Sequence, residues 1–162
     1  DLVVFDPATV KSDMGAAQEN INGWSHYDLG PDEAMIVEAT PVEARYWSLH
    51  IGNFWWESLD YASRHTSLNH HQAVLDADGV FRAVVAHRDP GVPNWLDTMG
   101  HTKGPLLFRW VVAEYGPEAK TKVVSFDQVR AHLPPETATV SPEERAEIMR
   151  RRRRGVQRRF AS

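Results

Sequence analysis

The sequence contains no cysteine among its 162 residues, which excludes disulfide bonds, thiolate nucleophiles and zinc sites with cysteine ligands. It also has no run of about 18 apolar residues, the length that a membrane-spanning helix needs. The amino-terminal stretch DLVVFDPATVKSD lacks the basic start and long apolar core of a signal peptide. It lacks an initiating methionine too, so we expect a processed chain or one piece of a longer polypeptide. The compartment stays open, with the cytoplasm slightly favoured.

Several motifs that carry common chemistries are missing as well. There is no Gly-x-Gly-x-x-Gly, Walker loop, Gly-x-Ser-x-Gly, His-Glu-x-x-His or EF-hand loop, which argues against the common nucleotide, hydrolase and zinc-protease chemistries. Of the eight histidines, His50, His71 and His87 lie in or beside expected strands, where imidazoles can hold Zn, Cu, Fe or Ni. Their spacing matches no metal motif. We therefore predict no metal site and leave any cofactor unassigned.

The composition is that of one globular domain, with 42% hydrophobic and 25% charged residues. The formal net charge of −4 hides an asymmetry, because residues 141–162 hold eight arginines against three glutamates. This tail carries +5 and the remaining body −9. We expect the tail to pack on its own acidic body or on that of a neighbouring subunit. Nucleic acid is an unlikely partner, since the body would repel phosphate and no recognition motif accompanies the arginines.

Alternating and apolar runs predict strands in the middle of the chain. In RYWSLHIG, residues 45–52, Trp47, Leu49 and Ile51 fall on one face. AMIVEAT, GPLLFRWVVAEY and TKVVSF are further strands. In the second of these, one side carries Leu106, Phe108, Trp110 and Val112. HQAVLDADGVFRAVVAH reads as a β-hairpin around a tight turn at residues 76–79.

The flanks of this region are different. Residues 1–33 are rich in Gly, Asp and Asn and predict an irregular lead-in segment. SFDQVRAHLP predicts one helical turn, and residues 141–162 predict a basic carboxyl-terminal helix that begins with a Ser141 to Glu144 capping box. The fold class is therefore all-β: a jelly-roll-like antiparallel β-sandwich over residues 34–140, closed by a carboxyl-terminal helix.

The stretch HRDPGVPNWLDTMGH, residues 87–101, is the first candidate site. Asp89, Asn94 and Asp97 have structural roles available in turns and short caps, so a rigid loop is a sufficient explanation. The density of acid, base and anion-binding groups beside an indole argues for function. We assign possible catalysis to His87, Asp89 and His101, and possible ligand binding to Arg88, Asn94, Trp95 and Asp97.

A second cluster lies just before the hairpin, in SLNHHQ. Asn69 and Gln72 could orient a polar ligand, and Trp55 and Trp56 upstream could stack on it. Alternatively, Asn69 simply starts a strand. The six tryptophans of the chain either fill a sandwich core or line a ligand cavity.

The segments GNFWWESLDY, SLN, DADG, VVAHRDPGVPNWLDT and GH follow one another in this order, and over about Asp28 to Trp110 the chain resembles the bacterial family called domain of unknown function 1214. The closing SPEERAEIMRRR is also similar to the end of such proteins. The resemblance implies a jelly-roll-like module that normally forms the carboxyl-terminal part of a longer chain, often behind another β-rich domain. It brings no established activity, so no catalytic residue is taken from it.

Three functional hypotheses follow from the sequence. The first is a module that binds a small, partly apolar organic molecule in a tryptophan-lined pocket. The second is an enzyme that uses His87 or His101 as general acid or base, with a histidine-bound metal as a variant. The third is a structural domain that forms a homo-oligomer or associates with an upstream β domain. Binding is preferred because it requires the fewest coincidences.

Overall fold

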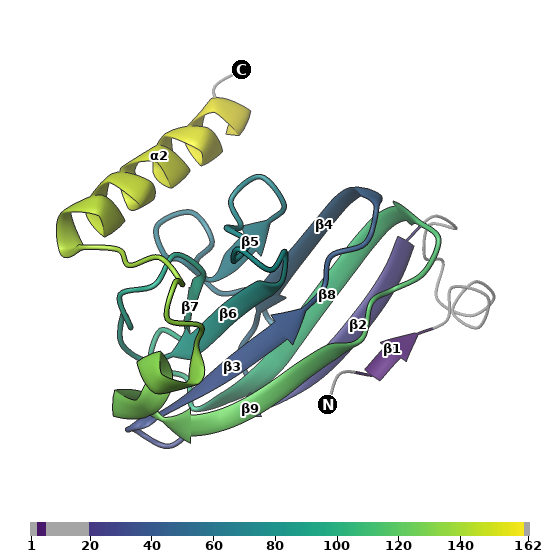
Figure 1. The fold of residues 1–162 in the computed structure, drawn as a ribbon. Coiled ribbons are helices and arrows are strands. Elements are labelled where there is room, and N and C mark those ends of the chain that lie inside the picture. The colour runs from purple at the N-terminus through teal and green to yellow at the C-terminus, as the bar shows by residue number, and fades with distance from the viewer. Residues whose placement is uncertain (1–2, 6–19, 161–162) are drawn as a thin grey trace.

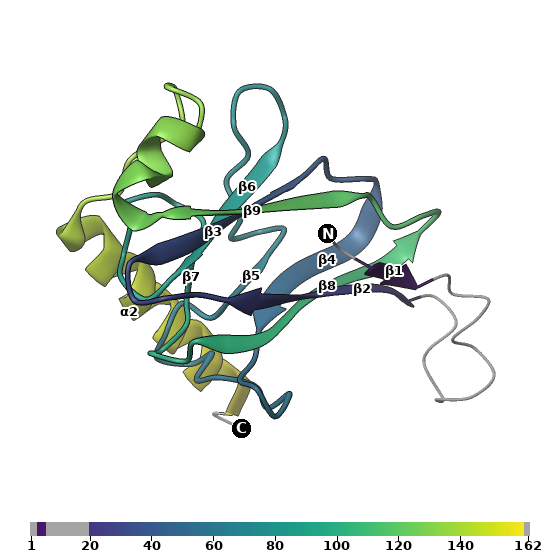
Figure 2. The same cartoon turned by 90° about the horizontal axis from the view of Figure 1, so that it is seen from below.

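Two β-sheets lie face to face in the computed structural model, which describes residues 3–5 and 20–160, and one long helix ends the chain (Figures 1 and 2). The five-stranded sheet has the order β1 (Val3–Phe5), β2 (Asn20–Asp28), β8 (Lys103–Ala113), β4 (Ala44–Ile51) and β5 (Ser67–Asn69). The four-stranded sheet has the order β7 (Trp95–Asp97), β6 (Phe81–Ala86), β3 (Glu33–Ala39) and β9 (Ala119–Ser125). A 3-10 helix, η1 (Phe126–His132), and the helix α2 (Pro142–Phe160) follow. The fold is a mostly antiparallel β-sandwich.

Alternation along β4 and β8 places the core between the sheets. Trp47, Leu49 and Ile51 of β4 are buried, as the sequence predicted. From β8, Phe108 and Trp110 stack in the same core with ring centroids 5.1 Å apart. The predicted inward face of β8 does not reach Val112, which is exposed because its φ of 54° breaks the strand's alternation.

The two sheets differ in how their outer faces are covered. Along β3, both faces are buried: Met35 and Val37 point into the sandwich core, and Ile36 packs in a second apolar cluster with Val129 of η1 and with Leu133, which follows η1. The outer face of the five-stranded sheet is less buried and mixes polar side chains such as Asn22, Ser48 and Arg109 with apolar ones such as Leu107 and Val111. A binding surface has room to form on this outer face.

Two sequence expectations need correction. Residues 20–28, expected within an irregular lead-in, form β2. Backbone pairing with β8 holds this strand, so small residues can occupy its buried face: Gly23 and Ser25 lie there beside Ile21 and Tyr27.

The predicted hairpin has its tight turn, with Gly79 at φ 78°, but its first arm contributes only an isolated bridge from Leu75 to Phe81. Strand β6 pairs with β3 and β7 instead.

The sheet is also not purely antiparallel, because β6 and β7 run parallel, with Val84 opposite Trp95. The connection between them, residues 87–94, must return the chain to the starting end of β6. Prolines and Gly91, at φ 70°, allow this sharp return. The sequence predicted a turn-rich loop here but gave no signal for a parallel neighbour.

The helix α2 begins with the predicted capping box. The Ser141 hydroxyl accepts a hydrogen bond from the Glu144 amide at 3.2 Å, and the Glu144 carboxylate accepts one from the Ser141 amide at 2.8 Å. Within residues 20–160, no helix is both long and apolar enough to cross a membrane.

Replacing Ser141 with alanine should weaken the start of α2, because it leaves the Glu144 amide without its acceptor. The expected cost is about 1 kcal/mol of local helix stability. Amide hydrogen exchange measured over residues 142–148 should become faster, while exchange in β3 and β6 stays unchanged. Equal acceleration in the strands would contradict a local capping role.

Candidate functional site

A cleft of about 940 Å³ lies between α2 and the outer face of the five-stranded sheet. Side chains of β4, β5 and β8 form its floor. One wall comes from the connections on either side of β5, and the other comes from α2. These segments are distant in the sequence, and the strand order β8, β4, β5 brings them together.

Strand register places the polar floor of the cleft in a row across the sheet. Arg109 of β8 lies opposite Ser48 of β4, and Ser48 lies opposite Asn69 of β5. On the other side, Arg109 lies opposite Asn22 of β2. Because successive side chains alternate between faces, His50 shares this outer face with Ser48. The floor therefore presents one cation among neutral hydrogen-bonding groups.

Arg109 is not neutralised by an acid within the described part of the chain. Its Nε donates to the neutral Asn22 Oδ1 at 3.3 Å, and none of the ion pairs includes it. The pKa of His50 is lowered by burial and further lowered by the charge of Arg109. His50 is therefore neutral at pH 7, and it can donate or accept a hydrogen bond without adding charge.

Arg145 fastens the first half of α2 to the sandwich. Its buried guanidinium binds both carboxylate oxygens of Asp89, with Nε to Oδ2 at 2.8 Å and Nη2 to Oδ1 at 3.2 Å. It also donates to the carbonyl oxygens of Val92 and Pro93 and lies over the ring of Trp95 at 5.3 Å. This bidentate pair with further backbone acceptors fixes the helix that forms the cleft wall.

Arg152 makes the second attachment of α2, and all its hydrogen-bond acceptors are neutral. Its Nε donates to the Tyr61 carbonyl at 2.6 Å, and its Nη1 donates to the Ser67 carbonyl at 2.9 Å. Its Nη2 donates to the Ser67 hydroxyl. Burial lowers the pKa of Arg152, and Asp60 only partly opposes this effect. A half-buried guanidinium without a paired carboxylate leaves positive charge directed at the cleft.

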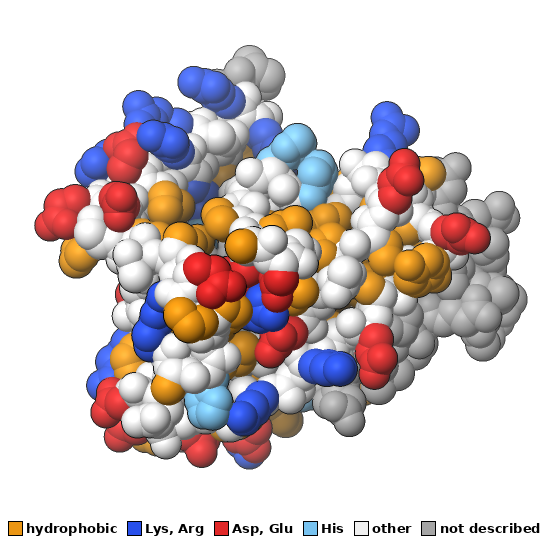
Figure 3. Space-filling model, viewed as in Figure 1, with side chains coloured by type: hydrophobic (Ala, Val, Ile, Leu, Met, Phe, Trp, Pro, Cys, Tyr) orange, Lys and Arg blue, Asp and Glu red, His pale blue; other side chains and the backbone are white. Residues whose placement is uncertain are grey.

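The charge of the cleft is of one sign. Its lining includes Arg109, Arg151, Arg152 and Arg159, and among the described residues that line it there is no Asp or Glu. Within residues 20–160, only Arg151 of these four has an acidic ion-pair partner, Glu147 at 3.2 Å. Figure 3 shows blue side chains gathered over α2, with red ones toward its amino-terminal end. In a chain of net charge −4, this is a local reversal that favours anions.

Apolar side chains complete the cleft. Ile51, Leu59 and Leu68 back the cleft on the sandwich side but are almost fully buried, and Ile148 and Val156 project from α2. Apolar walls with a few polar groups are the usual composition of small-molecule sites. A ligand that matches these walls and the four arginines has an apolar body and an anionic end.

His65 lies at the edge of the cleft but does not contribute charge to it. Its Nδ1 donates to the Trp95 carbonyl, so Nε2 carries the lone pair. Burial lowers the pKa of His65 to about 3, and the charges of Arg145 and Arg152 act in the same direction. Within the described residues, no group of three His, Cys, Asp or Glu side chains could hold a metal ion.

The polar residues of the second sequence cluster lie at the cleft, whereas Trp55 and Trp56 do not line it. Asn69 and Gln72 line the cleft, as do His50 and His71, whereas His87 does not. The Asn69 and Gln72 side chains also close their own turn: Asn69 Oδ1 accepts from two amides, and Gln72 Oε1 accepts from the Asn69 amide.

The predicted tryptophan-lined pocket is not found at the cleft, because no tryptophan is among its lining residues. Trp47 and Trp110 are buried in the sandwich core instead, where large rings fill the space between the sheets. Trp55 and Trp56 are exposed on a turn.

In the loop of residues 87–101, several predicted site residues hold the fold together. Asp89 accepts from the Gly91 amide and pairs with Arg145. Asp97 accepts from the Met99 amide and forms an ion pair with Arg64 at 2.7 Å. Their carboxylates are therefore engaged in structural contacts.

The remaining residues of this loop also have internal partners or lie away from the cleft. Trp95 Nε1 donates to the Ala86 carbonyl at 3.1 Å, and Arg88 lies over the Phe126 ring and reaches Asp32. The His87 imidazole binds the Thr98 hydroxyl at 2.6 Å, and His101 is exposed. Among the described residues, none of the three predicted catalytic positions lines the cleft.

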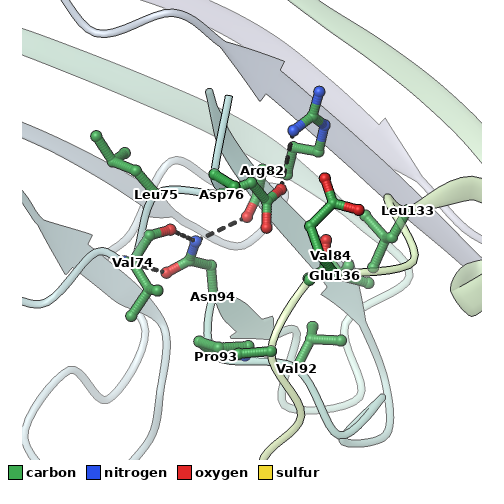
Figure 4. Close-up of a pocket in the computed structure, with 13 residues that line it drawn as sticks. Val74, Leu75, Asp76, Arg82, Val84, Val92, Pro93, Asn94, Leu133 and Glu136 are labelled. Carbon is green, nitrogen blue, oxygen red and sulfur yellow. Dashed lines mark hydrogen bonds and ion pairs between the residues drawn. The ribbon is translucent and has the colours of Figure 1, made fainter. Parts of the chain in front are cut away.

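Asn94 organises a second hollow of about 90 Å³, drawn in Figure 4. Its amide nitrogen donates to the carbonyls of Val74 and Arg82, and its oxygen accepts from the Val74 amide. Asp76 and Arg82 face one another across the opening at 2.9 Å. Most of these polar groups already bind one another, whereas the buried hydroxyl of Thr137, which also lines the hollow, has no hydrogen-bond partner in the described structure.

Sequence reasoning missed the two arginines that give the cleft its character. Arg109 stands alone among apolar neighbours on the outward face of an otherwise apolar strand, and this pattern is the signal that could have identified it. Arg152 is one of five consecutive arginines, so the sequence has no feature that separates it from Arg150 or Arg153. Only the packing of α2 distinguishes it.

Comparison with known proteins gives a fold and no activity. No protein-family model matches the chain, and no curated protein is significantly similar to it. The chain is similar to a solved but uncharacterised protein from Burkholderia cenocepacia, with 34% identity over 79% of this chain and a TM-score of 0.73. A protein from Vibrio parahaemolyticus is 15% identical over 62% of the chain, with a TM-score of 0.49. The chain covers 36% and 30% of those chains, about a third of their length.

Proposed function

We propose that this β-sandwich binds a small organic anion with an apolar body in the cleft beneath α2. The observation that carries the proposal is the cleft lining, which combines four arginines with apolar side chains. Among the described residues that line the cleft, none is an Asp or Glu. Arg109 and Arg152 would hold the anionic end, since neither has an acidic hydrogen-bond partner within residues 20–160. Ile148 and Val156 would contact the apolar body.

The electrostatics support an anion rather than a neutral ligand. A guanidinium offers several donors in a plane that matches a carboxylate or phosphate. The lowered pKa values of His50 and His65 keep these two imidazoles neutral at pH 7, so neither adds to the positive charge of the arginines. Because the attraction is between charges at an open cleft, affinity should decrease with added salt.

The first test uses three probes with the same chain length: decanoate, decanol and decyltrimethylammonium. Calorimetric titration should show decanoate binding at least about tenfold more tightly than either of the others, equivalent to about 1.4 kcal/mol. Equal binding of all three would show that the arginines do not select the ligand. Binding of none would remove the proposal.

Replacing Arg109 with methionine should weaken decanoate binding by about tenfold, because the substitution removes the charge but keeps an unbranched apolar stem. The melting temperature should stay unchanged, since Arg109 is exposed and has no ion pair within the described residues. The matched control is Arg153→Met on the exposed side of α2, which does not line the cleft. An equal loss in both variants would point to general charge rather than a site.

Other sequence hypotheses stay predictions. These are the membership in the domain of unknown function 1214 family, the jelly-roll connectivity, oligomer formation, association with an upstream β domain, and catalysis by His87, Asp89 and His101. No contact favours catalysis over binding, because Asp89 is engaged by Arg145 and His87 by Thr98. The proposal for the cleft uses none of them.

A further inference from the structure

A turn that follows β4 exposes three large aromatic side chains side by side. Phe54, Trp55 and Trp56 are 63%, 75% and 53% exposed. We call residues Asn53–Glu57 the aromatic turn. None of its three aromatic residues lines the cleft. Such a dense group of exposed rings needs an explanation beyond packing.

The aromatic turn is held rigidly, so the exposure of its rings is built into the fold. The Asn53 amide donates to the Glu57 carbonyl at 3.1 Å, and the Trp56 amide donates to the Asn53 carbonyl at 2.9 Å. The Asn53 side chain accepts from the amides of Trp55 and Glu57. Trp56 has a φ of 64°, a costly conformation for a bulky residue. Strain of this kind persists where the surrounding contacts impose it.

The rings form a braced projection. Trp56 contacts Trp24 of β2, with ring centroids 5.8 Å apart, and also lies near His26 at 5.9 Å. Phe54 and Trp55 meet edge to face at 5.1 Å. The sheet thus supports Trp56 from beneath, and Phe54 and Trp55 form the tip.

A strongly basic segment lies on the same side of the molecule. Residues 150–160 of α2 contain seven arginines and no acid, and all but Arg152 of these arginines are exposed. Phe160 at its end is 73% exposed. Figure 2 shows the carboxyl-terminal end of α2 and the loop after β4 both reaching the lower edge of the molecule, on the side of the five-stranded sheet. Arg152 ties α2 to the chain just after the aromatic turn, through its hydrogen bond to the Tyr61 carbonyl.

We propose that the aromatic turn and the basic end of α2 together dock this domain on the surface of an anionic lipid bilayer. Tryptophan and phenylalanine partition into the interface between lipid headgroups and acyl chains. Arginines near an anionic leaflet are attracted to it over about a Debye length. A rigid, projecting aromatic tip can insert among lipids, whereas the flat face of a protein partner would leave no space for it. This proposal does not depend on the ligand of the cleft.

Sedimentation with vesicles tests the docking directly. The chain should sediment with vesicles of phosphatidylcholine containing about one third phosphatidylglycerol, and much less with phosphatidylcholine alone. Tryptophan fluorescence should shift to shorter wavelength on binding, because Trp55 leaves water. No sedimentation with anionic vesicles would overturn the proposal. The proposal would also be overturned if the chain bound duplex DNA through its arginines and did not bind vesicles.

Variants separate the two elements from the cleft. The double substitution Phe54→Ser with Trp55→Ser should reduce vesicle affinity by at least about tenfold while decanoate binding persists. Arg153→Gln with Arg158→Gln should reduce it mainly at low salt. The control Tyr115→Ser removes a ring that is 61% exposed in the connection between β8 and β9. Vesicle affinity equal to that of the unmodified chain in the Phe54, Trp55 variant would overturn the role of the aromatic turn, and Arg109→Met should sediment normally.

Discussion

Replacing Arg145 with alanine should release α2 from the sandwich and abolish the cleft. Arg145 is only 6% exposed, and its removal leaves the Asp89 carboxylate without its bidentate partner and two backbone carbonyls without their donor. Breaking a buried ion pair in this way costs about 3 kcal/mol. The loss is concentrated in α2, because few other polar contacts join this helix to the sheets.

Hydrogen exchange resolves this effect by segment. In Arg145→Ala, amides of residues 146–160 should exchange at rates close to those of an unfolded chain, and decanoate binding should disappear. The strands β3 and β6 should keep most of their protection, since their core contains no residue of α2. Arg153→Ala on the exposed face of the same helix should leave all of these measurements unchanged. If α2 stayed protected without Arg145, its docking would have to come from Arg152 and the apolar contacts.

The same contact explains why the loop of residues 87–101 looked like an active site. Its acid Asp89 anchors α2, its indole Trp95 lies under Arg145, and its amide Asn94 ties β6 to the chain before it. A sequence shows which groups a loop contains but not which of them are already satisfied. Dense polar loops serve connection as readily as catalysis.

Strands with one buried face were predictable because alternation reports burial directly. The alternation of Trp47, Leu49 and Ile51 predicts β4 even when its neighbouring strands are not known. In β2, by contrast, Gly23 and Ser25 occupy buried positions, and the strand exists because β8 supplies its hydrogen bonds. Tertiary pairing decides such a segment, and local propensity does not.

The cleft was only partly predictable for a related reason. Asn69 and Gln72 were identified as ligand-binding candidates from a local cluster, and both line it. Arg109 and Arg152 are 43 positions apart and meet only through the strand order and the docking of α2. The apolar neighbours of Arg109 mark it as an outward-facing cation, but no local pattern shows that packing brings Arg152 to the same cleft.

Acid should destabilise the domain through His65 well before its carboxylates titrate. Burial holds the pKa of folded His65 at about 3, whereas the ordinary value is 6.5. Below pH 6.5 the unfolded chain therefore binds a proton that the folded chain does not, so stability is complete above pH 6.5 and is lost as the pH falls. Each pH unit within this window costs about 1.4 kcal/mol. From about pH 7.5 to about pH 4.5, the expected loss is about 2.5 kcal/mol.

Urea unfolding of His65→Asn separates this term from the rest. Asparagine can still donate to the Trp95 carbonyl but cannot take up a proton, so the variant should be less stable at pH 7.5 and should lose markedly less stability than the unmodified chain down to pH 4.5. The lowered pKa of His50 acts with the same sign, and His50→Asn measures its share. Below about pH 4, the lowered pKa of Asp60 adds its own loss in both proteins. A pH dependence in His65→Asn as steep as in the unmodified chain would show that another group carries the proton.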